Sequence, residues 1–242
     1  MVPLFFAEAS QPLDGDALVL SGTEGRHAAV VRRLRPGERV DVGDGAGLIA
    51  ECVVTGQRSG RLELAVKATR AVPRPEPGIT VIQAIPKGDR GELAVEEMTE
   101  VGVDRIVPWA AERSVPVWRD EAKGPARWRA AAREAAKQSR RAWIPEVAGP
   151  AATAEAARIV SAAALAVLLD PAATRPLAAA EVPAAGDLAV VVGPEGGITD
   201  AESAEFLAAG AIAARLGPSL LRTSTAGAVA AAVLLSRTPR WS

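Results

Sequence analysis

The 242-residue sequence is poor in the residues that build disulfides and metal sites. It holds one cysteine, Cys52, which excludes a disulfide framework within the chain and a cysteine-rich zinc site. It also holds one histidine, His27, so most histidine-based metal sites are excluded and a Ser-His-Asp triad would depend on that single residue. We therefore expect a function that uses no metal.

Long hydrophobic runs and an export signal are missing as well. The longest apolar runs, such as residues 226–235, have about ten residues, which is too short to span a bilayer. The first eight residues lack the basic flank and long apolar core of a signal peptide. Apolar residues still make up 49% of the chain, enough to bury a core. We expect a soluble, cytoplasmic protein with one large domain or two modest ones.

The whole chain is almost neutral, but two of its segments are strongly basic. The net charge of -1 by itself argues against a nucleic-acid partner. However, residues 26–39 hold five arginines against one acid, Glu38, and residues 123–141 hold seven basic residues against Glu134. Local basic patches, rather than net charge, determine the affinity for phosphates. The distribution therefore favours two phosphate-binding surfaces.

The residue pattern divides the chain into two domains and a linker. Residues 1–70 predict a small, mostly β barrel or sandwich, with strands at 16–20, 39–42, 48–54 and 61–66 and a helix over 23–34 capped by Thr23. Residues 71–78 carry alternate prolines, which favour a semi-rigid spacer. From residue 79 onward strands alternate with helices, which predicts an α/β domain with a doubly wound parallel sheet. The predicted strands are 79–85, 105–109, 165–170, 188–192 and 211–216, and the helices are 92–101, 126–141, 153–163, 200–208 and 224–236.

The most informative stretch is the predicted strand 188–192 and the turn that follows it. Five small or β-branched apolar residues predict a strand buried on both faces, and Gly193–Gly197 form a sharp turn. Thr199 and Glu202 then have the spacing of a capping box. Ligands bind at such carboxyl ends of strands in open α/β sheets, although a turn without a ligand fits the pattern equally well. The sequence has no G-x-G-x-x-G fingerprint and no Walker lysine, which argues against a nicotinamide dehydrogenase or a P-loop enzyme.

Two motifs carry a resemblance to a known family. Val-Gly-Pro-Glu-Gly-Gly-Ile-Thr at 192–199 and Leu-Gly-Pro-Ser-Leu-Leu-Arg-Thr-Ser-Thr-Ala at 216–226 resemble the SPOUT superfamily of RNA methyltransferases. Within it the chain is most similar to the 16S ribosomal RNA (uracil-N3) methyltransferase family, and the similarity extends over nearly the whole chain. Supporting motifs lie at 26–27, 31–37, 87–90, 99–103, 112–114, 138–141 and 144–146.

The resemblance implies a fold, a cofactor and a substrate. Residues 1–70 would form a PUA-like RNA-binding barrel, and residues 79–242 a SPOUT domain with a parallel sheet and a deep C-terminal trefoil knot. The protein would be a homodimer that binds S-adenosyl-L-methionine in the knot loops. It would methylate N3 of one uridine in the decoding region of 16S rRNA, within the 30S subunit.

The resemblance also implies site residues. Arg222 would hold a uracil oxygen or a flanking phosphate, although a structural arginine paired with an acid is the alternative. Glu195 would be a base or, preferably, an acceptor that orients loop amides. Thr225 would hydrogen-bond near the transferred methyl group, unless its hydroxyl caps the last helix. The expected cofactor-binding residues are Leu169, Gly193, Pro194, Glu195, Gly196, Gly197, Leu216, Gly217 and Leu221.

A long predicted helix would carry much of the RNA contact. Arg129, Arg133, Lys137 and Arg141 recur every four residues and so would share one helix face, which could also be simply a solvated face. Trp128 and Trp143 flank this helix and could stack on bases. The full set of expected RNA contacts is Arg26, Arg32, Arg33, Arg35, Lys87, Arg129, Arg133, Lys137, Arg140 and Arg141.

Some residues depart from the family pattern or lie outside it. Many members have glutamate where Ser224 and Lys137 stand, so a mechanism that needs a carboxylate there is in doubt. Gly227 stands where other members usually have a small residue that carries a side chain. Cys52 lies outside every motif, so it is interpreted as a core residue rather than the nucleophile of a uracil C5 methyltransferase. His27 is interpreted as a surface or capping residue.

Two other functions compete with N3 methylation. The first is another SPOUT reaction such as ribose 2′-O methylation, whose enzymes usually carry asparagine at the place of Arg222. The second is a non-catalytic RNA-binding or ribosome-assembly factor, against which the intact glycine loop argues.

Overall fold

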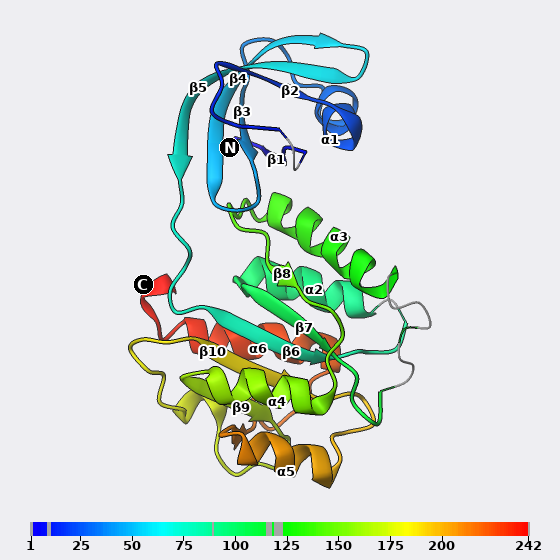
Figure 1. The fold of residues 1–242 in the computed structure, drawn as a ribbon, viewed down its shortest axis with the longest axis vertical. Helices are drawn as coiled ribbons and strands as arrows, with labels where there is room; N and C mark the ends of the chain where they lie inside the picture. Colours follow the sequence, from blue (N-terminus) through cyan, green and yellow to red (C-terminus); the bar gives the residue numbers. More distant parts are fainter. Residues whose placement is uncertain (1, 9–10, 89, 115–117, 119–122, 242) are drawn as a thin grey trace. The chain divides into compact units, whose positions relative to one another are not determined.

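The computed structural model describes residues 2–8, 11–88, 90–114, 118 and 123–241. The chain forms two compact units, one made of Met1–Arg74 with Ala136–Ile144 and the other of Pro75–Ala135 with Pro145–Ser242 (Figure 1). Asp89, part of the motif at 87–90, lies outside the described residues.

The first unit is built on a five-stranded sheet in the order β1-β3-β4-β5-β2. β1 pairs with β3 in parallel, and the other pairs are antiparallel. The four predicted strands are confirmed, but the short apolar β1 was not predicted because three residues show no alternation. The strands are β1 (Leu4–Phe6), β2 (Ala17–Leu20), β3 (Arg39–Gly43), β4 (Leu48–Arg58) and β5 (Arg61–Ala71).

The predicted helix over 23–34 is two shorter elements. α1 (Gly22–Arg26) runs into a π-helical turn, η1 (His27–Val31). Ser21, not Thr23, is the N-cap residue, and it makes no side-chain cap hydrogen bond, so the predicted cap is wrong. The reason is that the helix begins one residue earlier than predicted, at Gly22, which takes a φ of +61°. Thr23 therefore lies inside the helix and cannot be its cap.

Cys52 and His27 take structural places in this unit. Cys52 is 2% exposed within the hydrophobic core, which confirms the core interpretation. Burial, together with the nearby Asp41 carboxylate, raises the pKa of the Cys52 thiol to about 11, so it is not a ready nucleophile. His27 is half-buried, and its ring packs edge-on against Phe5 at 5.9 Å.

A segment far along the chain completes the first unit. The indole nitrogen of Trp143 donates to the carbonyl of Val72 at 2.9 Å, and the Ile144 amide donates to the carbonyl of Gly45 at 3.0 Å. The sequence pattern assigned residues 136–144 to the second domain, because nothing local marks them as partners of the first sheet.

The second unit holds a sheet of six parallel strands in the order β11-β9-β10-β6-β7-β8. This confirms the predicted doubly wound parallel sheet, while the two-residue strand β8 was not predicted. The strands are β6 (Ile79–Ala84), β7 (Arg105–Trp109), β8 (Glu146–Val147), β9 (Leu165–Leu169), β10 (Leu188–Val192) and β11 (Ile212–Ala214).

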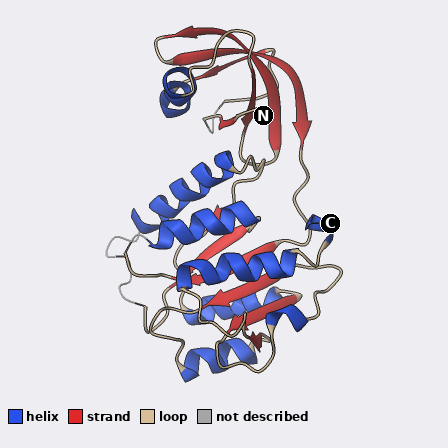
Figure 2. Cartoon of the chain, turned by 180° about the vertical axis from the view of Figure 1, so that it is seen from behind, coloured by secondary structure: helices blue, strands red, loops and turns tan. Residues whose placement is uncertain are grey.

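Helices cover both faces of this sheet. One face carries α4 and α5, and the other carries α2 and α6 (Figures 1 and 2). Gly102, at a φ of +107°, ends α2 as predicted. The helices are α2 (Arg90–Val101), α3 (Lys123–Gln138), α4 (Thr153–Ala162), α5 (Asp200–Ala208) and α6 (Thr223–Leu235), with short 3-10 turns η2 (Leu177–Ala179) and η3 (Pro239–Trp241). Among the described residues, no helix is both long and apolar enough to cross a membrane.

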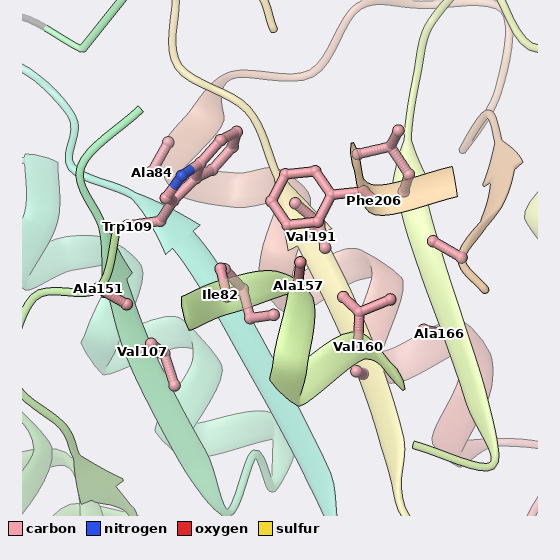
Figure 3. Close-up of a cluster of buried hydrophobic side chains, with 14 of the residues drawn as sticks. Ile82, Ala84, Val107, Trp109, Ala151, Ala157, Val160, Ala166, Val191 and Phe206 are labelled. Atoms are coloured by element: carbon pink, nitrogen blue, oxygen red, sulfur yellow. The ribbon is translucent and has the colours of Figure 1, made fainter. Parts of the chain in front are cut away.

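The two sheet faces pack differently. Beneath α4 and α5 lies a large apolar cluster in which Trp109 meets Phe206 edge-on at 5.0 Å, with Val160 and Ile82 beside them (Figure 3). On the other face, α6 comes so close that a Cβ on Gly227 would lie 3.0 Å from the Met98 sulfur and 3.1 Å from Gln83 Oε1. Gly227 therefore sets the short distance between α6 and the sheet.

Candidate active site

Three loops meet at the carboxyl edge of the second unit's sheet. β11, β9 and β10 are neighbours and parallel, so the loops that follow them leave the sheet side by side. The loops after β6 and β7, which begin at Ile85 and Ala110, leave at the same edge. Such an edge is where open α/β sheets bind their ligands.

Glu202 fastens the glycine loop after β10. Its carboxylate accepts hydrogen bonds from the backbone and hydroxyl of Thr199, at 3.0 and 2.9 Å, and the Thr199 hydroxyl accepts from the Glu202 amide. This is the predicted capping box. The same carboxylate also accepts from the amide of Glu112 at 2.8 Å, which joins the loop after β7 to the glycine loop.

The ionisation of Glu202 follows from these bonds. Burial raises the pKa of its carboxyl, but the donors from Glu112, Thr199 and Thr153 outweigh burial and hold the pKa below the ordinary value of 4.5. Glu202 is therefore a buried anion that fixes two loops at once.

The glycines of the loops serve different purposes. A Cβ on Gly193 would lie 2.6 Å from the Ile198 side chain, and Gly197 has a φ of +77°, so both are required by the fold itself. Gly217, in the loop after β11, has neither constraint, because a Cβ there would meet no atom within 4 Å. Open space beside Gly217 is available to a bound molecule.

Gln83, at the end of β6, positions the start of α6. Its side chain is completely buried, and Nε2 donates to the carbonyls of Thr223 at 3.2 Å and Ala84 at 3.1 Å. The reverse orientation of the amide would place its oxygen against two carbonyl oxygens, so the network fixes the orientation. Because Gln83 lies opposite Val192 in the sheet, the Thr223 backbone is held beside the start of the glycine loop.

Backbone hydrogen bonds also tie the loop after β9 to the loop after β11. The Asp170 amide donates to the carbonyl of Ala214 at 3.0 Å, and the Leu177 amide donates to that of Arg215 at 2.8 Å. The three leucines predicted for the cofactor pocket are half-buried: Leu169 is the last residue of β9, and Leu216 and Leu221 lie in the loop after β11.

The predicted catalytic side chains lie on these loops. Arg222 and Glu195 are exposed, and Thr225 is half-buried in the first turn of α6. Arg222 is the N-cap residue of α6, and no side-chain cap hydrogen bond is made, so the capping alternative for Thr225 is wrong. Among the described residues, no carboxylate lies within ion-pair distance of Arg222, so the alternative of a paired arginine finds no partner there.

Comparison with known proteins gives two family matches. Residues 74–235 match the model of an RNA methyltransferase domain, and residues 20–66 match that of an RNA methyltransferase PUA domain. The chain is 45% identical to the ribosomal RNA small subunit methyltransferase E of Mycobacterium tuberculosis, over 100% of this chain and 94% of the relative. The chain belongs to the ribosomal RNA small subunit methyltransferase E family.

Solved structures agree with this family. Ribosomal RNA small subunit methyltransferase E from Neisseria gonorrhoeae, bound to S-adenosyl methionine, superimposes with a TM-score of 0.86 at 29% identity, covering 98% of each chain. A Legionella pneumophila protein in complex with the cofactor SAM gives a TM-score of 0.87 at 28% identity, again over 98% of each chain.

The structure corrects part of the RNA-contact set predicted for this member of the methyltransferase E family. Lys137 is 6% exposed, and its ammonium binds the Glu24 carboxylate at 3.1 Å, so it is not on an exposed face. The helix ends at Gln138 and Arg140 takes a φ of +57°, so Arg141 lies beyond the helix rather than on the same face.

The predicted stacking tryptophans are also corrected. Trp128 is 2% exposed and packs edge-on against Trp118 at 5.1 Å. Trp143 is half-buried, and the Arg74 guanidinium covers its ring at 5.1 Å. Neither ring is free for a base. Arg133 and Arg141 are half-buried, and the expected contacts that are exposed are Arg26, Arg32, Arg33, Arg35, Lys87, Arg129 and Arg140.

Proposed function

We propose that this protein uses S-adenosyl-L-methionine to methylate N3 of a uridine in the decoding region of 16S rRNA, within the 30S subunit. The observation that carries the proposal is the arrangement at the carboxyl edge of the second sheet. There Gln83 and Glu202 hold the α6 start and the glycine loop in place, and Arg222 stands at the N-terminus of α6 without an acidic partner among the described residues.

The residues at this edge fit the cofactor. Gly193, Pro194, Glu195, Gly196 and Gly197 would offer backbone groups to the adenosine, with Gly217 leaving room for it. The half-buried side chains of Leu169, Leu216 and Leu221 would supply apolar walls, as adenine requires. When bound, the cofactor supplies a methyl group on a positively charged sulfur.

The chain's own residues would then orient and activate the uracil. Methyl transfer to nitrogen is an in-line displacement, so positioning supplies much of the rate. Uracil N3 carries a proton at neutral pH, which would pass to solvent water, and the Arg222 guanidinium would stabilise the N3 anion that then takes the methyl group as the sulfur leaves. Glu195 would orient loop amides, and Thr225 would hydrogen-bond near the transferred group.

The proposal includes a trefoil knot at the C-terminus. Its support is that the chain leaves the edge strand β11, returns to the middle of the sheet, and places α6 against β6, β10 and η2. A crystal structure that routes residues 215–222 outside the segment between β9 and β10 would remove the knot.

The proposal also includes a homodimer. Val229 and Val233 of α6 are half-buried, and Leu93 on the neighbouring α2 is 45% exposed, which leaves apolar surface for a second copy. We expect sedimentation to give twice the mass of one chain, and Leu93→Lys to shift it toward the monomer. A parent protein that sediments as a monomer would contradict this part.

Methyl transfer to ribosomal subunits tests the function. Purified protein, labelled S-adenosyl-L-methionine and 30S subunits that lack the modification should yield 3-methyluridine after nuclease digestion and mass spectrometry. A 2′-O-methylated nucleoside would establish the rival SPOUT reaction. No label, together with retained binding to the subunit, would establish a non-catalytic factor.

A further inference from the structure

The first unit exposes two valines in the middle of its most basic segment. Val30 is 55% exposed and Val31 is 68% exposed. Both belong to the π-helical turn η1, next to α1 in Figure 1. Four arginines and no acid lie between residues 26 and 37, namely Arg26, Arg32, Arg33 and Arg35, and all four are exposed.

The backbone around the valines is anchored, so their exposure is built into the fold. Ala28 and Ala29, just before them, are 0% and 3% exposed and lie in the core of the unit. Leu34, just after them, packs partly against the same core. The Arg32 amide donates to the carbonyl of His27 at 2.9 Å, the long-range bond of a π-helix, and this geometry turns Val30 and Val31 outward.

Local stability does not explain two valines at this place. An exposed valine buries little apolar area, and β-branched residues are weak helix formers. The nearby acids are already engaged: Glu24 binds Lys137 at 3.1 Å, and Glu38 accepts from the Arg35 amide at 3.0 Å. The segment therefore presents apolar side chains framed by positive charge that no nearby carboxylate neutralises.

We propose that Val30 and Val31 contact an unpaired base of the RNA substrate, while the surrounding arginines bind its phosphates. This proposal rests on the RNA substrate of the proposed function. The positive charge of the arginines favours a nucleic acid as the partner. The exposed side chains of Val30 and Val31 favour a base that is not enclosed in a duplex, because proteins read RNA through bases that are splayed out of the stack. The valines would supply the part of the affinity that does not depend on salt.

Equilibrium binding to two RNAs tests the proposal. The probes are a 16S rRNA fragment that contains the unpaired decoding-region bases and a fully paired duplex of the same length. For the double variant Val30→Ser/Val31→Ser we expect binding to the fragment to weaken roughly tenfold, about the effect of leaving one valine side chain unburied, and binding to the duplex to stay the same. The slope of log affinity against log salt should not change, whereas Arg32→Gln should reduce that slope by about 0.7, the share of one phosphate on single-stranded RNA.

A matched control separates the valines from general apolar loss. Val19 of β2 is 41% exposed in the same unit but lies outside the basic segment, so Val19→Ser should leave both affinities unchanged. Equal weakening on fragment and duplex, a changed salt slope, or no effect on either RNA would overturn the proposal. Unchanged RNA binding with a loss confined to intact 30S subunits would also overturn it, and would indicate a ribosomal protein as the partner. Because these are binding measurements, a parent enzyme that binds RNA but transfers no methyl group would refute the proposed reaction and leave this inference standing.

Discussion

At the carboxyl edge of the second unit's sheet, the side chains of Gln83 and Glu202 are buried and bound to backbone. The basic segment of the first unit leaves its arginines in solvent. Gln83 and Glu202 each connect strands or loops that are far apart in the chain. In contrast, Arg26, Arg32 and Arg33 are exposed and make no ion pair among the described residues. A small cofactor needs loops held in place before it arrives, whereas a flexible polyanion is bound well by exposed charges.

The largest effect is expected at the Arg240–Asp104 ion pair, a buried polar contact of the second unit that lies before β6 and β7 begin and holds the C-terminal turn. The Arg240 side chain is 9% exposed, and it binds Asp104 at 2.6 Å and the carbonyl of Gly102 at 2.8 Å. Because Arg240→Ala leaves the Asp104 carboxylate poorly compensated, we expect it to lower the free energy of unfolding by about 3–5 kcal/mol. Urea denaturation measures this, with the substitution of the exposed Arg158 of α4 by alanine as the control. A loss below that of the control would mean that buried pairs do not hold this unit.

The next effect in size concerns Arg222. We expect Arg222→Ala to lower kcat about 100-fold or more, as removal of a charge-stabilising donor does, and to leave the affinity for S-adenosyl-L-methionine within about twofold. Single-turnover methyl transfer and calorimetry measure the two quantities. Arg215→Ala, an exposed arginine of the same loop, is the control. Retained turnover would remove Arg222 from the active site.

Replacing Glu202 by glutamine should disturb both loops that it joins. At pH 7 we expect a loss of about 2 kcal/mol in the free energy of unfolding, because glutamine offers one acceptor oxygen where the carboxylate offers two, so the amide of either Glu112 or Thr199 would face an NH2 donor. The pKa of Glu202 is lower in the folded than in the unfolded state, so its carboxylate stabilises the fold above pH 4.5 and that contribution is lost as the pH falls further. The difference between parent and variant should therefore narrow in acid. A difference that is constant from pH 7 to pH 3 would contradict the role of the anion.

The exposed arginines should give the smallest effects on stability. Arg26→Gln is expected to change the free energy of unfolding by less than about 0.5 kcal/mol, as is usual at the surface. Thermal denaturation checks this. A large loss of stability would show that Arg26 supports the fold rather than a ligand.

Local patterns in the sequence predicted the elements that are specified locally. Residues 188–192 are the strand β10, and Thr199 with Glu202 form the expected capping box. The connections between distant residues left no local signal. Glu202 binds the Glu112 amide across 90 positions, and Gln83 binds Thr223 across 140. The available hint was the long polar side chain of Gln83 in a strand whose other residues are apolar except for Thr80.

The basic helix shows why periodicity alone misled. A spacing of four residues predicts a shared face only while the helix continues, and here it ends at Gln138, before a non-glycine residue with positive φ. The side chain of Lys137 is buried rather than exposed to solvent, because the carboxylate of Glu24, 113 positions earlier, supplies its counter-charge. Neither the helix end nor the buried partner can be read from the spacing of arginines and lysines.

Gly217 gives the most direct test that the loops at the sheet edge bind the cofactor. A Cβ there would meet no atom within 4 Å beyond its chain neighbours, so we expect Gly217→Val to leave the melting temperature of the free protein unchanged. In calorimetric titration with S-adenosyl-L-methionine, the same variant should bind at least about tenfold more weakly, because the valine would occupy space needed by the ligand. Undiminished affinity in a normally folded Gly217→Val protein would contradict a cofactor site between these loops.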